Sequence, residues 1–267
     1  MVKIGMIGAC GRMGRRIIAL ASQDKEIEVT AGYEYPESEF IGEDLGILAG
    51  IGEINIKVES DIKSAAKKCD VLIDFTGAKG TINNIEDYKL ANIPLVIGST
   101  GFNDDEIKII NELSKNIPVI LAPNMSLGVN LTLKVLEMVS QAIGDSYDIE
   151  IIEAHHRLKK DAPSGTALKM AEVIANTLNR DLEKDAVYCR RGLVGERKDR
   201  EIGIQTIRAG DIVGEHTVIF CGQGERIEIT HKAHTRDTFA KGAIAGAKWI
   251  KGRDSGLYNM FDVLGLK

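Results

Sequence analysis

Short runs of consecutive apolar residues alternate with helix-like stretches through the first half of the chain. Runs such as Val71–Phe75 are apolar at successive positions, which is typical of strands that are covered on both faces. The expected strands are Val2–Ile7, Glu28–Tyr33, Val71–Phe75, Pro94–Ile97 and Pro118–Leu121, and the expected helices are Gly14–Ser22, Thr81–Ala91 and Asp104–Lys115. This alternation predicts an α/β unit with a Rossmann-type, doubly wound parallel sheet.

The pattern changes in the second half. The long amphipathic stretch Leu127–Ile143 is followed by the run Ile149–His155 and by a helix-like segment, Thr166–Leu178. Three further strands then follow one another with short turn-like segments between them, at Ile202–Arg208, Val213–Cys221 and Arg226–His231. Strands joined in this way are expected to be antiparallel. The second half therefore predicts an α+β domain with a mainly antiparallel open sheet.

Two domains are expected from this change of pattern. Residues 1–125 would form the first domain, and residues 126–240 would form the second. The last helix-like segment, Lys241–Arg253, is expected to return to the first sheet, so residues 241–267 are assigned to the first domain.

Composition narrows the class of function. The chain has 267 residues, of which 44% are apolar and 27% charged, and this is sufficient for two domains with cores. The formal net charge is −5 and the basic residues are scattered, so neither a nucleic-acid partner nor a membrane partner is expected. No export signal is expected, and the four cysteines lack disulfide or metal-binding spacing. We expect a cytoplasmic protein that acts on small molecules.

A glycine-rich segment follows the first expected strand directly. The segment Gly8–Gly14 has the spacing G-x-x-G-x-x-G, and a helical pattern opens immediately after it. Glycines let a backbone approach a pyrophosphate, whose charge is met by the N–H groups and dipole of the helix. Glycines that merely punctuate a turn would not explain this placement. A dinucleotide-binding turn is predicted, made by Gly8, Ala9, Cys10, Gly11, Arg12 and Met13.

Glu34 follows the second expected strand, about 20 residues beyond the turn, where a carboxylate can accept hydrogen bonds from the adenosine ribose. This position favours NADH. The alternative is an ordinary solvated glutamate in an acidic loop. Arg12, Arg15 and Arg16 could attract the 2′-phosphate of NADPH, so the preference between the two cofactors stays open.

Two further loops follow expected strands, at the edge where open α/β sheets bind ligands. In the first, Gly98 permits close approach of the backbone and Thr100 offers a hydroxyl to a ribose or a nicotinamide amide. The cofactor-binding residues expected in these loops are Gly98, Ser99 and Thr100, followed by Ala122, Pro123, Asn124 and Met125. Either segment could be a simple connection, but their shared edge favours a role in binding.

The segment 153–166 holds the densest chemistry. His155 and His156 supply two imidazoles, the side-chain type suited to proton transfer, and Lys159 lies close by in sequence as a fixed positive charge. Ser164 is expected to cap a helix whose first N–H groups, at Gly165 and Thr166, could bind a carboxylate. A dicarboxylate substrate fits these parts. No metal site is expected, because adjacent histidines point apart. The histidines His216, His231 and His234 have no comparable sequence setting.

Taken together, these segments resemble the dihydrodipicolinate reductase family over nearly the whole chain. The resemblance is carried by Gly8–Gly14, Gly98–Phe102, Ala122–Ser126, His155–Leu168, Arg208–His216 and Ile229–Ala233. It implies NAD(P)H-dependent reduction of 4-hydroxy-tetrahydrodipicolinate, or of dihydrodipicolinate, to tetrahydrodipicolinate in lysine and diaminopimelate biosynthesis. It also implies that the first domain binds the dinucleotide, and that the second binds the substrate and forms a homotetramer.

The resemblance further implies roles for individual residues. Glu34 matches the family's ribose-binding acid. Hydride would pass to substrate C4, with His155 as proton donor and Lys159 as a second one. A His155 imidazolium is expected to be stabilised among carboxylates. His156 would contact the substrate, while Gly165 and Thr166 would hold one of its carboxylates.

Two positions depart from the family pattern. Ser99 stands where many members have threonine, and Tyr35 stands where some have an arginine suited to a 2′-phosphate. The second departure agrees with Glu34 and makes NADH at least a competent cofactor. Two rival functions are a reductase of the aspartate-dehydrogenase type and a regulator that binds NADH without chemistry.

Overall fold

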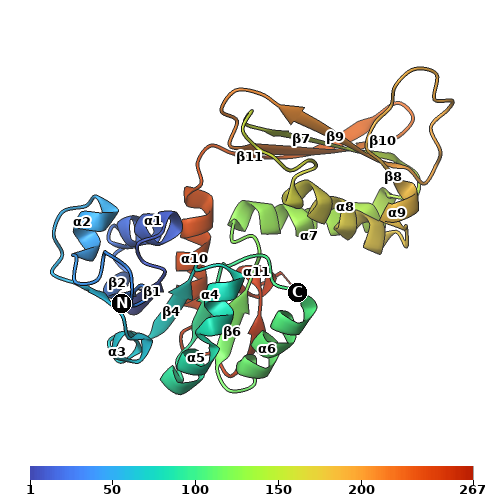
Figure 1. Cartoon of the computed structure of the whole chain (residues 1–267). Coiled ribbons are helices and arrows are strands. Elements are labelled where there is room, and N and C mark those ends of the chain that lie inside the picture. Colours follow the sequence, from blue (N-terminus) through green and yellow to red (C-terminus); the bar gives the residue numbers. More distant parts are fainter. Residues whose placement is uncertain (267) are drawn as a thin grey trace. The chain divides into compact units, whose positions relative to one another are not determined.

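The computed structural model describes residues 1–266, so the last residue of the expected first domain, Lys267, lies outside the described residues. The chain separates into two compact units (Figure 1). The first comprises Met1–Leu127 and the chain from Asp237 onward, and the second comprises Gly128–Arg236. No helix among the described residues is both long enough and apolar enough to cross a membrane.

Within residues 1–266, the first unit contains a seven-stranded sheet in which all strand pairs are parallel. The strand order is β12-β6-β5-β4-β1-β2-β3, and the strands are β1 (Val2–Ile7), β2 (Ile27–Tyr33), β3 (Val58–Glu59), β4 (Val71–Asp74), β5 (Leu95–Ile97), β6 (Pro118–Leu121) and β12 (Gly256–Tyr258). The order reverses between β1 and β4, which is the position where doubly wound sheets bind ligands. The predicted Rossmann-type sheet is confirmed.

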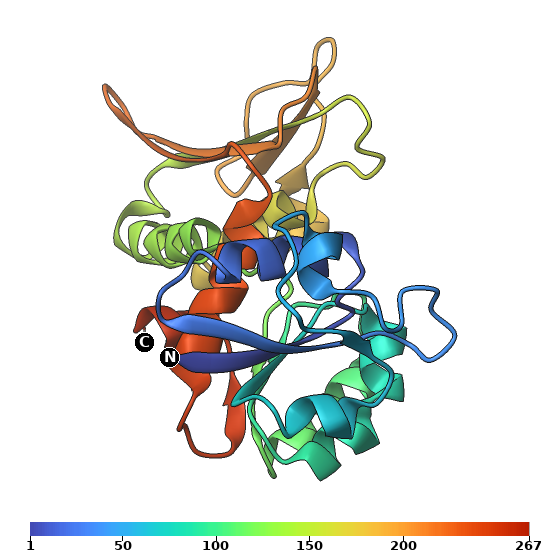
Figure 2. The same ribbon diagram turned by 90° about the vertical axis from the view of Figure 1, so that its left-hand side faces the viewer.

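Helices cover both faces of this sheet (Figure 2). On one face, β-strand residues such as Ile4 and Ile73 pack with α1 and α10; on the other, Leu72 and Ile97 pack with α3, α5 and α6. The helices of the unit are α1 (Arg12–Ala21), α2 (Leu45–Ala49), α3 (Ile62–Ala66), α4 (Ala78–Asn83), α5 (Ile85–Ala91), α6 (Asp104–Ser114), α10 (Asp237–Ile250) and α11 (Met260–Leu264). The single helix expected over Thr81–Ala91 is instead the pair α4 and α5, because the backbone leaves the helical conformation at Asn84.

The second unit packs helices against one face of a five-stranded sheet, as described within residues 128–236. The sheet order is β11-β10-β7-β9-β8, with β7 (Asp148–His155), β8 (Ala186–Val187), β9 (Ile202–Arg208), β10 (Gly214–Cys221) and β11 (Arg226–Ala233). The helices are α7 (Leu127–Ile143), α8 (Gly165–Thr177) and α9 (Leu182–Asp185). Along β7, the residues Ile149 and Ile151 of the inner face are fully buried, while Glu150 and Ile152 of the outer face are not.

The sheet of this unit contains the expected antiparallel strands together with a parallel part. The strand β10 is antiparallel to β11 and to β7, but β9 is parallel to both β7 and β8. The sheet is therefore mixed. A parallel β7–β9 pair needs a long crossover connection, which α8 supplies, whereas the hydrophobic pattern of a strand carries no information about the direction of its partner.

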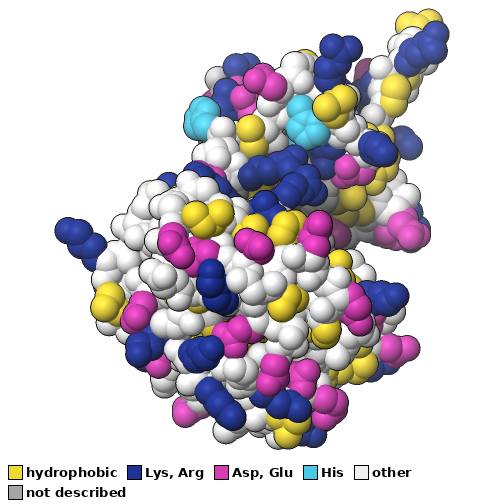
Figure 3. All heavy atoms as spheres, turned by 60° about the vertical axis from the view of Figure 1, so that its left-hand side comes forward, with side chains coloured by type: hydrophobic (Ala, Val, Ile, Leu, Met, Phe, Trp, Pro, Cys, Tyr) yellow, Lys and Arg dark blue, Asp and Glu magenta, His cyan; other side chains and the backbone are white. Residues whose placement is uncertain are grey.

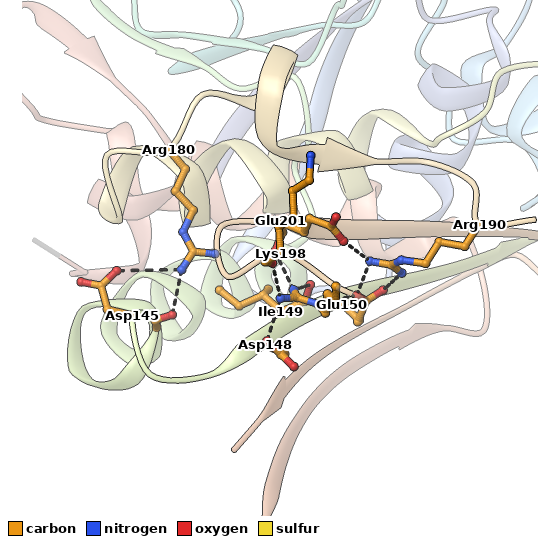
Figure 4. A network of polar contacts seen from close by, with 10 residues as sticks. Asp145, Asp148, Ile149, Glu150, Arg180, Arg190, Lys198 and Glu201 are labelled. Carbon is orange, nitrogen blue, oxygen red and sulfur yellow. Dashed lines mark hydrogen bonds and ion pairs between the residues drawn. The ribbon is translucent and has the colours of Figure 1, made fainter. Parts of the chain in front are cut away.

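The segment between β8 and β9 is held by a network of charged side chains (Figure 4). The Arg190 guanidinium binds both oxygens of Glu150 at 2.9 Å and also contacts Glu201. Arg197 contacts Asp148 and donates to the main-chain carbonyl oxygens of β7 and of its own segment. These contacts anchor both ends of a segment in which Leu193 is fully exposed.

We predict that Gly242→Ala destabilises the first unit strongly, because a methyl group at this position of α10 would overlap the carbonyl oxygen of Met125. We expect a loss of about 2 kcal/mol or more, as for other overpacked sites. Gly246→Ala on the same helix is the matched control, since its methyl group would meet the flexible end of Ile120 at 3.3 Å and the Val96 methyl groups at the ordinary contact distances of 3.6 and 3.9 Å. Urea unfolding followed by circular dichroism should separate the two variants, and equal midpoints would contradict the prediction.

Candidate functional site

The glycine-rich turn has the backbone geometry of a phosphate site. Gly8 has a φ of 76°, and its N–H and that of Ala9 both donate to the Tyr33 carbonyl oxygen. A side chain at Gly14 would overlap the carbonyl oxygen of Gly8, so α1 packs against the turn only because this residue is glycine. Gly11 precedes α1 and has no side chain to cap it. The first N–H groups of α1 are thus suited to an anion.

Glu34 is held against this turn. Its Oε2 accepts from the Cys10 N–H at 3.1 Å, and its Oε1 accepts from the Tyr35 N–H at 3.4 Å. Burial, together with the neighbouring Glu34 carboxylate, raises the pKa of the Cys10 thiol to about 12, so the thiol stays protonated. Beside Glu34 lies a cavity of about 510 Å³, lined by Gly8, Gly11, Tyr33, Glu34, Tyr35, Pro36, Phe75, Thr76, Gly80, Asn83 and Asn84.

A second cavity, of about 300 Å³, adjoins the first at Phe75, which lines both. It is lined by Met13, Phe75, Gly77, Gly98, Ser99, Thr100, Pro123, Met125 and Phe239, so loops expected to bind the cofactor meet here. Gly98 packs directly on the Phe75 ring, which a side chain at Gly98 would overlap. The Ser99 hydroxyl accepts from the Gly77 N–H at 2.9 Å, and Ser99 is buried.

The other residues expected at the cofactor site lie in the same turns. Ala9 and Ala122 are buried, and Cys10 is half-buried with its N–H directed to Glu34. Arg12 is exposed at the start of α1, and Asn124 accepts from the Ser126 N–H through its side chain. The paired cavities, the uncapped helix and the glycine contacts together fit a dinucleotide.

Two arginines that sequence analysis considered for a 2′-phosphate are engaged within the first unit. Arg15 donates to the Cys10 carbonyl oxygen at 2.7 Å and lies over the Phe40 ring. Arg16 forms a bidentate ion pair with Asp237. Arg12 and Arg16 are both exposed, but the Arg16 guanidinium is occupied by its ion pair.

In the second unit, polar residues gather at one end of an otherwise apolar inner sheet face. His231, His216, Glu153 and Thr206 are register partners in turn across β11, β10, β7 and β9. His155 and Arg208 form the next pair along β7 and β9. Because alternate residues of a strand share a face, this arrangement places all of these side chains on the face that α8 covers.

Glu153 is the centre of this polar cluster. It is 0% exposed, and its carboxylate accepts two 2.8 Å hydrogen bonds from Arg208. It lies 2.6 Å from His155 Nδ1 and accepts from the Ser164 N–H at 3.0 Å. Burial alone would raise the pKa of Glu153, but the hydrogen bonds from Arg208, His155 and Ser164 outweigh it and lower the pKa to about 2. Glu153 is therefore ionised at neutral pH.

The charge on Glu153 sets the tautomer of His155. An ionised carboxylate only accepts hydrogen bonds, so His155 Nδ1 carries a proton and Nε2 is the nitrogen that exchanges one. Burial lowers the pKa of His155, and Lys159 and Arg208 lower it further, although Glu153 raises it. On balance the pKa of His155 is lowered, chiefly by burial, although the Glu153 carboxylate favours the imidazolium.

The remaining expected substrate residues lie around His155 in the second unit. Lys159 is half-buried and lies 2.9 Å from the Asp161 carboxylate. Ser164 caps α8 by accepting from the Ala167 N–H, and this leaves Gly165 exposed and Thr166 half-buried in the first turn. His156 is half-buried at the end of β7. Figure 3 shows Lys and Arg side chains gathered near histidine on this unit.

Sequence reasoning missed part of this cluster. Glu153 and Arg208 lie within the sequence motifs, but no role was predicted for them, although their charges shift the pKa of His155. His216, which was said to lack a comparable setting, packs edge-on against His155 and lies 2.9 Å from the Ser164 hydroxyl. Burial, with the positive fields of nearby residues, lowers the pKa of His216 to about 4. The described residues contain no group of three or more ligating side chains that could hold a metal ion.

Comparison with known families decides the identity of this fold. Residues 2–125 match the family described as dihydrodipicolinate reductase, N-terminus, and residues 128–264 match dihydrodipicolinate reductase, C-terminus. The chain belongs to the dihydrodipicolinate reductase family. It is thus an oxidoreductase, and family membership supports a nicotinamide cofactor and the reduction step in lysine biosynthesis.

Curated relatives match the sequence of this chain over 96% or more of their own length. The protein of Geotalea daltonii named 4-hydroxy-tetrahydrodipicolinate reductase is 52% identical over 267 residues, covering 100% of both chains. The protein of the same name from Acinetobacter baylyi is 52% identical over 263 residues, which is 98% of this chain and 96% of the relative.

Solved structures support the fold. The dipicolinate-bound dihydrodipicolinate reductase from Paenisporosarcina sp. TG-14 has a TM-score of 0.76 at 23% identity and covers 98% of each chain. Amine dehydrogenase from Mycobacterium smegmatis has a TM-score of 0.62 at 9% identity, with 97% of this chain and 95% of that one covered. The two-unit architecture is therefore shared with dehydrogenases that differ widely in sequence.

We predict that two substitutions shift the pKa of His155 in opposite directions. Glu153→Gln removes the carboxylate that raises this pKa and leaves Arg208 uncompensated, so the pKa should fall further. Lys159→Met removes a positive charge, so the pKa should rise. Nuclear magnetic resonance titration of the His155 Cε1–H signal measures both shifts. Shifts of the same sign would show that the charges around His155 are wrongly assigned.

Proposed function

We propose that this chain reduces 4-hydroxy-tetrahydrodipicolinate, or dihydrodipicolinate, to tetrahydrodipicolinate in lysine and diaminopimelate biosynthesis. The proposal rests mainly on His155, which Glu153 orients; the charge of Lys159 acts on His155, and Ser164 at the start of α8 donates to the same Glu153. An ionisable imidazole beside fixed positive charge and the first N–H groups of a helix suits proton transfer to a dicarboxylate. Family membership supports the same reaction.

In this proposal His155 acts through Nε2. Its Nδ1 stays bonded to Glu153, so the imidazole keeps its orientation while Nε2 gains and loses the proton. Because burial, Lys159 and Arg208 depress the pKa of His155, the carboxylates of the substrate must supply the field that favours the imidazolium. Substrate binding would then favour protonation of His155 at Nε2. His155 would deliver this proton to the enamine that forms after hydride reaches substrate C4.

Lys159 and the start of α8 would bind the substrate. Lys159 is held by a single exposed carboxylate, Asp161, which the substrate could replace as its partner. The N–H groups of Gly165 and Thr166 lie in the first helical turn, where the dipole favours a carboxylate. His156 would add a further substrate contact. Lys159 would offset negative charge that develops during the reaction and serve as a second proton donor.

We propose that the first unit binds the reduced dinucleotide and uses NADH more readily than NADPH. Glu34 lines the 510 Å³ cavity, where its carboxylate suits ribose hydroxyls and repels a 2′-phosphate. Arg15 and Arg16 are engaged elsewhere and so are poorly placed to offset that repulsion. Tyr35, beside Glu34, brings no charge of its own.

The second unit would also carry the oligomer interface. Its outer sheet face exposes part of Ile152, Ile207 and Ile219, which in a homotetramer would be covered by other copies. We propose a cytoplasmic homotetramer on the basis of this face and of the biosynthetic reaction.

The reaction is tested by following NADH oxidation at 340 nm, with substrate generated from pyruvate and aspartate semialdehyde by the preceding synthase. We predict that His155→Gln lowers kcat by on the order of 100-fold or more, as for the loss of other general acids, while the Kd of NADH is unchanged. His234→Gln is the control, because His234 is an exposed histidine of the same unit. A folded chain that binds NADH but oxidises it only with ammonia and oxaloacetate would refute the proposed reaction.

We predict that Tyr35→Arg raises kcat/KM for NADPH by on the order of tenfold, because a guanidinium beside Glu34 would pair with the 2′-phosphate. Tyr35→Gln removes the same ring without adding charge and should leave the ratio of kcat/KM values for NADH and NADPH near that of the unmodified enzyme. Equal gains with NADPH in both variants would mean that the ring, and not charge, controls the choice.

A further inference from the structure

Asp74 is a buried carboxylate at the carboxyl end of β4, and the reaction described above gives it no role. Its side chain is 0% exposed. Its Oδ1 accepts from the Thr76 N–H and the Thr76 hydroxyl, both at 2.7 Å, and lies 3.4 Å from the Ser99 hydroxyl. Its Oδ2 accepts from the Tyr88 hydroxyl at 2.9 Å.

The partners of Asp74 are neutral. In the described chain, the donors to its carboxylate are the main-chain N–H of Thr76 and four hydroxyls, which belong to Thr76, Thr81, Tyr88 and Ser99. None of these groups carries positive charge. A carboxylate without a nearby cation projects its field further than one that is paired. Burial raises the pKa of Asp74, and the hydrogen bonds from Thr76, Thr81 and Tyr88 oppose that rise because they favour the ionised form.

These partners also build the cofactor cavities. Thr76 lines the 510 Å³ cavity, and Ser99 lines the 300 Å³ cavity. Ser99 accepts from the Gly77 N–H, so the loops that follow β4 and β5 are tied together above Asp74. On the Tyr88 side, the hydroxyl accepts from the Asn84 amide at 3.3 Å, and Asn84 lines the larger cavity. A single buried carboxylate therefore supports the walls of both cavities.

We propose that Asp74 is a positioning residue whose negative charge favours binding of an oxidised, cationic nicotinamide over binding of the reduced, neutral one. The inference rests on the proposed function, in which the 300 Å³ cavity receives the nicotinamide. A bound reduced cofactor would supply the hydride and would thereby become a cationic nicotinamide, while the substrate would take up that hydride and then a proton. The Asp74 carboxylate keeps its own bonds throughout and lowers the energy of the positive charge that develops nearby.

The decisive measurement is the ratio of two affinities, those for NAD⁺ and NADH, without any substrate. Asp74→Asn keeps the size of the side chain, and its amide can still accept from Thr76 and donate to the Tyr88 hydroxyl. We expect the variant to lose NAD⁺ affinity by on the order of tenfold relative to NADH, since a unit charge within about 10 Å has roughly this effect at an effective dielectric constant of about 20. Isothermal titration calorimetry gives both Kd values.

Tyr88→Phe is the matched control, because it removes one hydrogen bond to Asp74 and leaves the charge in place. Both Kd values should then change by the same factor. A shift of their ratio in Tyr88→Phe as large as that in Asp74→Asn would overturn the proposal. Equal changes in both Kd values in Asp74→Asn would also overturn it, since they would reveal a purely structural role.

This test is independent of the proposed reaction. If the synthase-coupled assay fails but the NAD⁺ to NADH affinity ratio changes in Asp74→Asn, the chain uses its nicotinamide site for another substrate. If the assay succeeds and the ratio does not change, the proposed reaction stands and the role of Asp74 does not.

Discussion

A carboxylate taken out of water must receive its hydrogen bonds from the protein, and each unit of this chain is organised around one such group. In the second unit, Arg208 pairs with Glu153 and the pKa of Glu153 falls to about 2. In the first unit, Asp74 receives only neutral donors, and burial raises its pKa. The two carboxylates therefore differ in their partners: Glu153 is paired with the Arg208 guanidinium, whereas Asp74 is held by neutral donors, two of which line the cofactor cavities.

The hydrogen bonds of Glu153 also tie the start of α8, at Ser164, to the site. The Ser164 N–H donates to Glu153, while the Ser164 hydroxyl accepts from the Ala167 N–H and lies beside His216. One residue thus connects the buried carboxylate, the histidine pair and the helix start. Because these contacts share Glu153 and Ser164, the orientation of His155 and the exposure of the first α8 N–H groups depend on the same set of hydrogen bonds.

Sequence reasoning predicted the parts of the molecule that depend on local pattern. The strand, glycine turn and helix at the start of the chain were expected from their order in the sequence, and the structure adds that glycine is required where α1 meets Gly8. The loops containing Gly98 and Pro123 were expected to meet because parallel strands end at one edge, and both line the 300 Å³ cavity. By contrast, the parallel pairing of β9 with β7 was not foreseen, since register and direction depend on how the chain crosses over.

The amino-acid sequence by itself determined the family, the parallel sheet of the first unit and the residue types available for chemistry, because these follow from periodicity and from motifs that are contiguous along the chain. Only the tertiary structure decided which charges act on those residues. Arg208 reaches Glu153 across 55 positions, and His216 meets Ser164 across 52. Arg16 is engaged by Asp237 from a distant part of the chain. Electrostatic fields depend on distance in space and on burial, and strand pairing sets both.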